Sequence, residues 1–144
     1  MRKKICILLI AACLSFIWIN SFFPADISSG LSGTAEKILR AIFGENIPIT
    51  EGILRKMAHG AEYAAFGAVI SVFLYEKITK KLSLIGFCGL GTAVFDETIQ
   101  LFSDGRSSQV KDIWIDFSGF TAGVIFILII KVLFDYLKGK NRQL

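Results

Sequence analysis

The chain has 144 residues, of which 53% are hydrophobic and only 19% are charged. In an ordinary soluble domain about a quarter of the residues are charged, so this composition excludes that class and indicates an integral membrane protein. The formal net charge of +4 comes without a basic stripe interleaved with aromatic residues, so we expect no nucleic-acid partner.

Four apolar segments are each long enough to cross a bilayer as a helix. They predict an all-α integral membrane protein whose four transmembrane helices form a single domain over residues 1–144. The expected spans cover about 5–23, 55–75, 82–102 and 113–134. Because no A-x-A-like cleavage site follows the first of them, we expect a retained span rather than a signal peptide.

Basic residues indicate the orientation of these spans. Lys and Arg are concentrated before the first span, in the turn 76–81 and after the last span. The positive-inside rule assigns such segments to the cytoplasm. We therefore expect a multi-pass protein of the cell membrane with both termini in the cytoplasm. The segments 24–54 and 103–111 would then face outside.

The first outer loop contains apolar residues at helical spacing, namely Leu31, Ala35, Ile38, Leu39, Ile42 and Phe43. The charged residues Glu36, Lys37 and Arg40 lie off this stripe. The pattern predicts a short amphipathic helix, which either lies on the membrane surface or packs on the mouth of the helix bundle. After this helix, Thr50 is expected to cap the N-terminus of the second span.

The second span carries ionisable residues where a membrane helix is normally apolar. Arg55, His59 and Glu62 are spaced i, i+4 and i+7, so they lie on one helical face. An ionisable residue inside a span is unfavourable by about 3 kcal/mol or more and therefore indicates a function. The alternative is that His59 and Glu62 form only a hydrogen-bonded pair that holds helices together.

The third and fourth spans each carry a polar face as well. Asp96 and Gln100 share a face of the third span at i, i+4, and Glu97 shares one with Gln100 at i, i+3. One face of the fourth span consists of Asp112, Asp116, Gly119 and Gly123. Structural alternatives exist for each residue. The acidic pair of the third span would cap the bundle mouth, Asp112 would cap the fourth helix, and the two glycines would serve helix packing.

These polar faces all lie in the outer half of the expected spans. A lipid-facing position would be unfavourable for each, so we expect them to converge on a shared pocket that opens outward. Carboxylates outnumber fixed cations there. The cations are Arg55 and Arg106, and the carboxylates are Glu62, Asp96, Glu97, Asp112 and Asp116. If the pocket carries out chemistry, the expected acid/base groups are His59, Glu62, Asp96 and Asp116. Their spacing matches no recognised metal motif, so we expect neither a metal nor a cofactor.

Two blocks of the sequence resemble the signature of the VanZ-like family of small bacterial membrane proteins. The first begins at Arg55 and reads R-K-M-A-H-G-A-E-Y-A-A-F-G. The second begins at Asp96 and reads D-E-T-I-Q-L-F-S-D-G-R-S-S-Q-V-K-D-I-W-I-D-F-S-G-F-T-A-G. The resemblance implies that the following residues are motif positions of the family: Arg55, Lys56, His59, Glu62, Tyr63, Asp96, Glu97, Gln100, Arg106, Asp112, Asp116 and Gly119.

The resemblance implies a Gram-positive-type cell envelope and a role in low-level resistance to teicoplanin and related lipoglycopeptides. It implies no particular reaction, so whether the protein is an enzyme stays open. The residues expected to bind a ligand are Arg55, Lys56, Tyr63, Glu97, Gln100, Arg106 and Asp112.

The expected partners are membrane lipids and an amphiphilic or lipid-linked envelope ligand. Arg55 and Arg106 would hold the anionic head group of that ligand, and the protein would bind or modify it. Two other functions remain open from the residues. One is a non-catalytic partner subunit of an envelope complex, and the other is a proton-coupled carrier.

Overall fold

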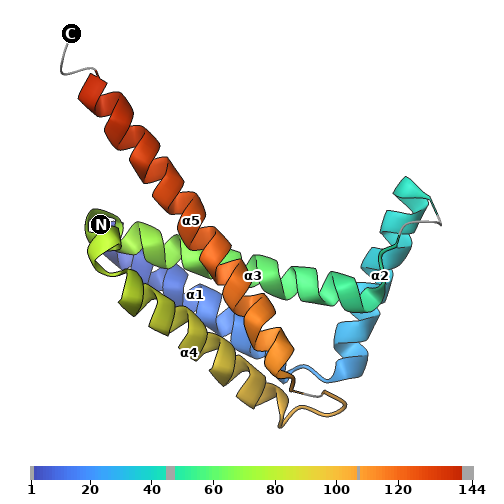
Figure 1. Cartoon of the computed structure of the whole chain (residues 1–144). Helices are drawn as coiled ribbons and strands as arrows, with labels where there is room; N and C mark the ends of the chain where they lie inside the picture. The colour runs from blue at the N-terminus through green and yellow to red at the C-terminus, as the bar shows by residue number, and fades with distance from the viewer. Residues whose placement is uncertain (1, 45–47, 107, 141–144) are drawn as a thin grey trace.

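The computed structural model describes residues 2–44, 48–106 and 108–140 of the chain. All regular secondary structure in this part of the chain is helical, as the sequence predicts (Figure 1). The elements in order are α1 Arg2–Phe22, α2 Ala25–Phe43, α3 Glu51–Phe73, the 3-10 helix η1 Tyr75–Lys80, α4 Leu82–Gln100 and α5 Val110–Lys140.

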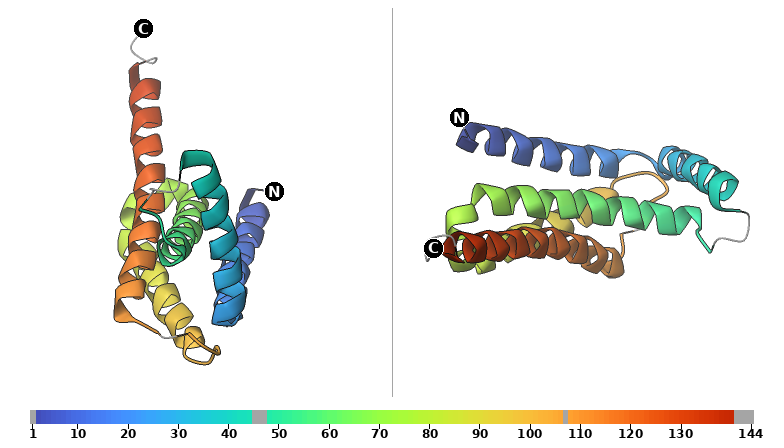
Figure 2. Two further views of the ribbon diagram at one scale, coloured as in Figure 1. Left: turned by 90° about the vertical axis from the view of Figure 1, so that its right-hand side faces the viewer. Right: turned by 90° about the horizontal axis from the view of Figure 1, so that it is seen from above.

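Helix α3 is the centre of the bundle. It packs against α1, α2, α4 and α5, and its contact with α5 is the most extensive. The helix η1 turns the chain back at one end, where Lys3 of α1 and Tyr75 line the same cavity. Helix α2 lies at the opposite end, and the last turns of α5 extend beyond the other helices (Figures 1 and 2).

Small residues allow α3 and α5 to approach closely. A Cβ atom added to Gly119 would collide with the backbone carbonyl of Gly60, and one added to Gly123 would collide with that of Ala64. Phe120, between the two glycines, is buried with its ring centroid 5.3 Å from that of Phe66. The packing role considered for the two glycines is therefore confirmed, and this contact fixes how the two helices face each other.

Three helices of the described part are long and apolar enough to cross a membrane, namely Lys3–Phe22, Leu82–Gln100 and Val110–Gly139. These correspond to the first, third and fourth expected spans. Helix α3 is absent from this set although it has 23 residues. Its first half carries Arg55, Lys56 and Glu62, which lower its mean hydropathy.

The ends of all four expected spans differ by some residues from those of the observed helices, and the differences are largest for α5 and α3. Helix α5 begins before and ends after 113–134 because its backbone continues through the polar residues on either side of the apolar segment. Helix α3 begins at Glu51 rather than at residue 55. Its N-cap is Thr50, as predicted, and the Thr50 side chain accepts a hydrogen bond from the Ile53 amide at 3.4 Å.

The amphipathic helix predicted in the first loop is present as α2. It packs against α3, as one of the two alternatives requires. Its first residue, Ala25, donates a backbone hydrogen bond to the carbonyl of Asp104 at 3.1 Å, which ties α2 to the loop after α4. Ile38, Ile42 and Phe43 are exposed. The side chain of Leu31, also part of the expected stripe, lies outside the described residues.

Candidate functional site

A pocket of about 110 Å³ lies at the end of the bundle away from η1. Helices α3, α4 and α5 and the loop after α4 all contribute to it. The residues predicted from the sequence that line it are Arg55, Lys56, His59, Glu97, Gln100, Arg106, Asp112 and Asp116. The structure thus brings together most of the polar residues that the sequence places at one depth.

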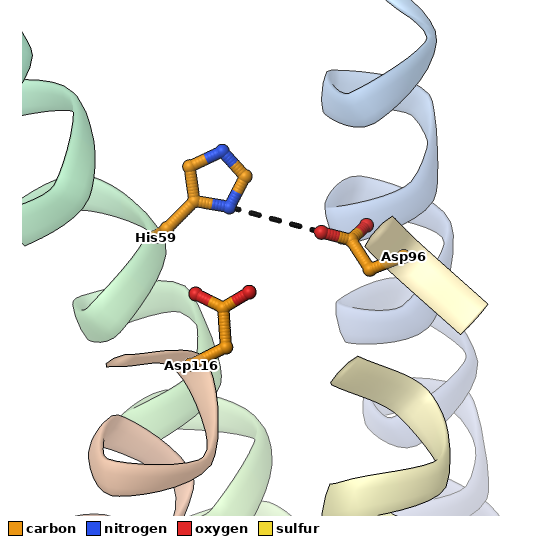
Figure 3. A group of neighbouring side chains, drawn as sticks. All are labelled: His59, Asp96 and Asp116. Carbon is orange, nitrogen blue, oxygen red and sulfur yellow. Dashed lines mark ion pairs between the residues drawn. The ribbon is translucent and has the colours of Figure 1, made fainter. Parts of the chain in front are cut away.

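The innermost part of the site joins one side chain from each of three helices. His59 comes from α3, Asp96 from α4 and Asp116 from α5, and all three are buried (Figure 3). His59 Nδ1 lies 3.9 Å from Asp96 Oδ2, and the Asp116 carboxylate points toward the space between them. One nitrogen or oxygen atom of each residue lies within 4.8 Å of those of the other two. This arrangement is able to hold a metal ion.

Asp96 is held in place from two sides. The Ser21 hydroxyl of α1 donates to Asp96 Oδ1 at 2.6 Å, and the Gln100 side-chain amide donates to Oδ2 at 3.2 Å. The predicted shared face of Asp96 and Gln100 is therefore confirmed. Asp96 is fully buried, so these donors replace the water that would otherwise solvate its carboxylate.

Glu97 orders the loop that precedes α5. Its carboxylate accepts a hydrogen bond from the Gln109 backbone amide at 2.8 Å, just before the first residue of the helix. The side chain is buried, so the alternative of a solvent-exposed cap at the bundle mouth is wrong for this residue. Glu97 instead joins the end of α4 to the start of α5.

Lys56 and Asp112 form a salt bridge across the entrance, with Lys56 Nζ 2.6 Å from Asp112 Oδ1. Asp112 lies within the first turn of α5, which begins at Val110. The alternative that Asp112 is the N-cap of this helix is therefore wrong, although its negative charge still lies near the positive end of the helix dipole. The bridge neutralises one pocket cation.

Two arginines supply positive charge to the pocket. Arg106, in the loop after α4, donates from Nη2 to the Asn20 carbonyl at 3.0 Å, and its buried Nε has no hydrogen-bond partner among the described residues. Burial, and secondarily the charge of Arg55, lowers the pKa of Arg106. Arg55 forms no ion pair within the described part of the chain. Both side chains are thus available to an anion.

Three predicted site residues do not line the pocket, namely Asp96, described above, Glu62 and Tyr63. Glu62 Oε1 accepts a hydrogen bond from the Asn20 side chain of α1 at 2.9 Å, and Glu62 Oε2 is buried without a partner among the described residues. Tyr63 is completely buried in the core, where its hydroxyl also has no described partner. The alternative that His59 and Glu62 form only a hydrogen-bonded pair is wrong, because Glu62 turns toward α1 and His59 toward Asp96.

Several polar partners of the site lie outside the helical faces expected from the sequence. Asn20 and Ser21 of α1 contact Glu62 and Asp96, and the Gln109 amide contacts Glu97. Gly105, Gln109 and Ile115 also line the pocket. A signal for the α1 residues was present, because Asn20 and Ser21 are polar residues at the end of an apolar run, on the side where the pocket was expected.

The charges of the site divide into two regions. Arg55 and Arg106 give one region an excess of positive charge that suits an anionic group. His59, Asp96 and Asp116 give the other a set of nitrogen and oxygen donors that suits a cation. The arginine region is therefore able to bind an anionic group such as a phosphate, and the second region is able to bind a cation.

Comparison with known proteins identifies a family. The family model described as VanZ/LLP1 matches residues 6–131, which covers most of the chain and all of the site. No curated protein matches the chain, and no solved structure does.

Proposed function

Because the chain belongs to the VanZ/LLP1 family, we propose that it acts at the cell envelope and contributes to low-level resistance to teicoplanin and related lipoglycopeptides. In this proposal the pocket binds the anionic head group of an amphiphilic or lipid-linked ligand. The observation that carries it is that Arg55 and Arg106 line one pocket at the end of a bundle of apolar helices. The planar guanidinium group matches phosphate and carboxylate groups better than any other side chain does.

The proposal includes α3 as a fourth membrane span. Its 23 residues are enough to cross a bilayer. Its polar residue His59 is buried against the neighbouring helices, so that side chain would not contact lipid. Lys77 and Lys80 lie in η1, and the positive-inside rule assigns that turn to the cytoplasm. The pocket, at the other end of the bundle, would then open on the outer side.

The size of the pocket favours a head group over a whole amphiphile. Its volume of about 110 Å³ is well below the roughly 300–1,000 Å³ of clefts that enclose a drug-sized ligand. Next to pocket-lining residues in the sequence, Met57 and Trp114 are exposed apolar side chains. The apolar part of the ligand would lie along exposed apolar side chains such as these, within the bilayer. Retention or modification of such a ligand would lower the amount of lipoglycopeptide held at the cell surface.

A susceptibility assay tests the resistance role. It compares the teicoplanin susceptibility and surface-bound drug of cells that express the wild type, Arg106→Gln or the double variant Arg55→Gln, Arg106→Gln, at matched protein abundance. We expect the single variant to reduce protection and the double variant to abolish it. Lys131→Gln is the control, because Lys131 pairs with Asp135 far from the pocket. Full protection by the double variant would disprove the proposal.

A binding assay tests the head-group preference directly. The purified protein in nanodiscs is titrated with dioleoyl phosphatidic acid and, separately, with dioleoyl phosphatidylcholine. Because the phosphatidylcholine head group is zwitterionic, we expect tighter binding of phosphatidic acid, reduced by at least about tenfold in the double arginine variant. Equal affinity for the two lipids in the wild type would contradict an anion-selective pocket.

A further inference from the structure

The described residues contain one buried group of an imidazole and two carboxylates. Binding of an anion in the pocket does not explain why these side chains lie together. His59, Asp96 and Asp116 are 8%, 0% and 2% exposed, and each comes from a different helix. One atom of each lies within 4.8 Å of those of the others (Figure 3). Two carboxylates in so small a buried space repel each other if both are ionised. A ligand of opposite charge would remove that repulsion.

One ring nitrogen of His59 faces this group without a hydrogen-bond partner. His59 Nδ1 is buried and has no hydrogen-bond partner among the described residues. Its distance of 3.9 Å from Asp96 Oδ2 is too long for a hydrogen bond. Buried polar atoms in folded proteins almost always have a partner, so an orphaned nitrogen aimed at two carboxylates indicates a missing group between them.

The cations near this group, Arg55 among them, form no ion pair with its two carboxylates in the described part of the chain. Lys56 Nζ pairs with Asp112 at 2.6 Å, and Arg106 donates to the Asn20 carbonyl at 3.0 Å. Neither forms an ion pair with Asp96 or Asp116. A divalent cation would balance the charge of the two carboxylates, and the neutral imidazole would supply a third ligand.

The distances are close to those of a metal site. Nitrogen and oxygen ligands lie about 2.0–2.2 Å from Zn²⁺, so tetrahedral ligands are about 3.3–3.6 Å from one another. The separation of His59 Nδ1 from Asp96 Oδ2 is 3.9 Å, and the widest in the group stays within 4.8 Å. Small side-chain rotations would close these gaps once an ion attracts the ligands.

The surroundings also fix one ligand in the manner of metal sites. Ser21 and Gln100 donate to the two oxygens of Asp96, which orients the carboxylate. Such outer contacts are a regular feature around metal ligands. The other two residues, His59 and Asp116, line the pocket, so one side of the group is open to it.

We propose that His59, Asp96 and Asp116 together bind one divalent metal ion, with Zn²⁺ as the ion that best suits one imidazole and two carboxylates. The fourth coordination position faces the pocket that holds Arg55 and Arg106. The role of the ion would be to contact an oxygen of the anionic head group, and only this role rests on the function proposed above. Binding of the ion depends on the three side chains alone.

The test measures Zn²⁺ bound to the full chain in detergent or nanodiscs. The protein is stripped with EDTA, dialysed and titrated with ZnCl₂, and bound metal is measured by mass spectrometry and calorimetry. We expect about one Zn²⁺ per chain. Substitution of Co²⁺ should give the visible absorption bands of a tetrahedral site. The variants Asp116→Asn and His59→Gln should each bind at least about tenfold more weakly, because each loses one ligand.

Asp135→Asn is the matched control, since it makes the same change on the same helix in an exposed position. It should bind Zn²⁺ as the wild type does. Circular dichroism verifies that each variant is folded. If Asp116→Asn does not fold, the wild type still tests the proposal, because Zn²⁺ should raise its Tm and EDTA should reverse the rise.

Two results would overturn the metal site. One is a folded wild type that binds no stoichiometric Zn²⁺, and the other is unchanged affinity in both His59→Gln and Asp116→Asn. The outcomes also separate this proposal from the function above. Zinc binding without phosphatidic acid binding would keep the metal site and reject the head-group pocket. If the metal-free protein binds phosphatidic acid but the protein binds no zinc, the head-group pocket is kept and the metal site is rejected.

Discussion

The hydroxyl of Ser21 lies 2.6 Å from Oδ1 of Asp96, and both side chains are completely buried. This contact joins the end of α1 to α4 across the bundle. The backbone carbonyl of Ser21 accepts a second hydrogen bond, from the Ser103 hydroxyl at 2.8 Å. Helix α1 is therefore more than a membrane anchor, because it fixes the rear wall of the candidate site.

Removal of the Ser21 hydroxyl should destabilise the fold. In Ser21→Ala a buried carboxylate oxygen loses its donor, and we expect the free energy of unfolding in mixed micelles to fall by about 1–3 kcal/mol. Ser118→Ala is the control, because the Ser118 hydroxyl is exposed and bonds to the Trp114 carbonyl of its own helix. Equal stability of the wild type and Ser21→Ala would mean that the contact carries little free energy.

The close packing of α3 and α5 should tolerate no side chain at its centre. In Gly119→Ala the added methyl group meets the Gly60 carbonyl, and we expect a loss of about 1–3 kcal/mol in the free energy of unfolding. Gly86→Ala is the control, since no atom of the described residues lies within 4 Å of the added Cβ. It should keep or slightly raise stability, because Ala is the better helix former. Similar stability changes in both variants would count against the packing.

The salt bridge at the entrance should be weak and salt-dependent. Lys56 and Asp112 are both partly exposed, so a double-mutant cycle with Lys56→Gln and Asp112→Asn should give a coupling energy of about 0.2–1 kcal/mol. High ionic strength should reduce this coupling, because exposed charges are screened. A coupling several times larger, and insensitive to salt, would show that the entrance excludes water.

The carboxylate of Glu97 should control the loop before α5. Glu97→Ala removes the acceptor of the Gln109 amide, so we expect that amide to exchange its hydrogen with water about tenfold faster or more. Glu97→Gln keeps a carbonyl oxygen that is able to accept the same bond and should largely preserve protection. If Glu97→Ala leaves exchange at Gln109 unchanged, the loop is held by other contacts.

Much of the secondary structure could be predicted from local pattern. Apolar runs of sufficient length predict α1, α4 and α5, and the helical stripe in the first loop predicts α2. The N-cap at Thr50 follows from its residue type and position. Residues at i, i+4 share a face in any α-helix, so the pairing of Asp96 with Gln100 could also be predicted.

Contacts between helices could not be predicted in the same way. Periodicity assigns Glu62 to the same helical face as His59. It does not say which neighbouring helix each of the two side chains contacts. In the fold, Glu62 contacts Asn20 of α1 and His59 approaches Asp96 of α4. The backbone contact of Glu97 with Gln109 also depends on the path of a loop, which residue types alone do not determine.

The sequence by itself determined that charged and polar residues of several apolar helices lie at a similar depth, because hydropathy and helical rise depend only on residue order. Only the tertiary structure decided which of them meet. The approach of α3 and α5 at Gly119 and Gly123 fixes the rotation of each helix about its own axis. That rotation brings His59 and Asp116 together with Asp96 of α4, while it directs Glu62 toward Asn20 of α1, because residues three positions apart on a helix differ by about 60° in direction.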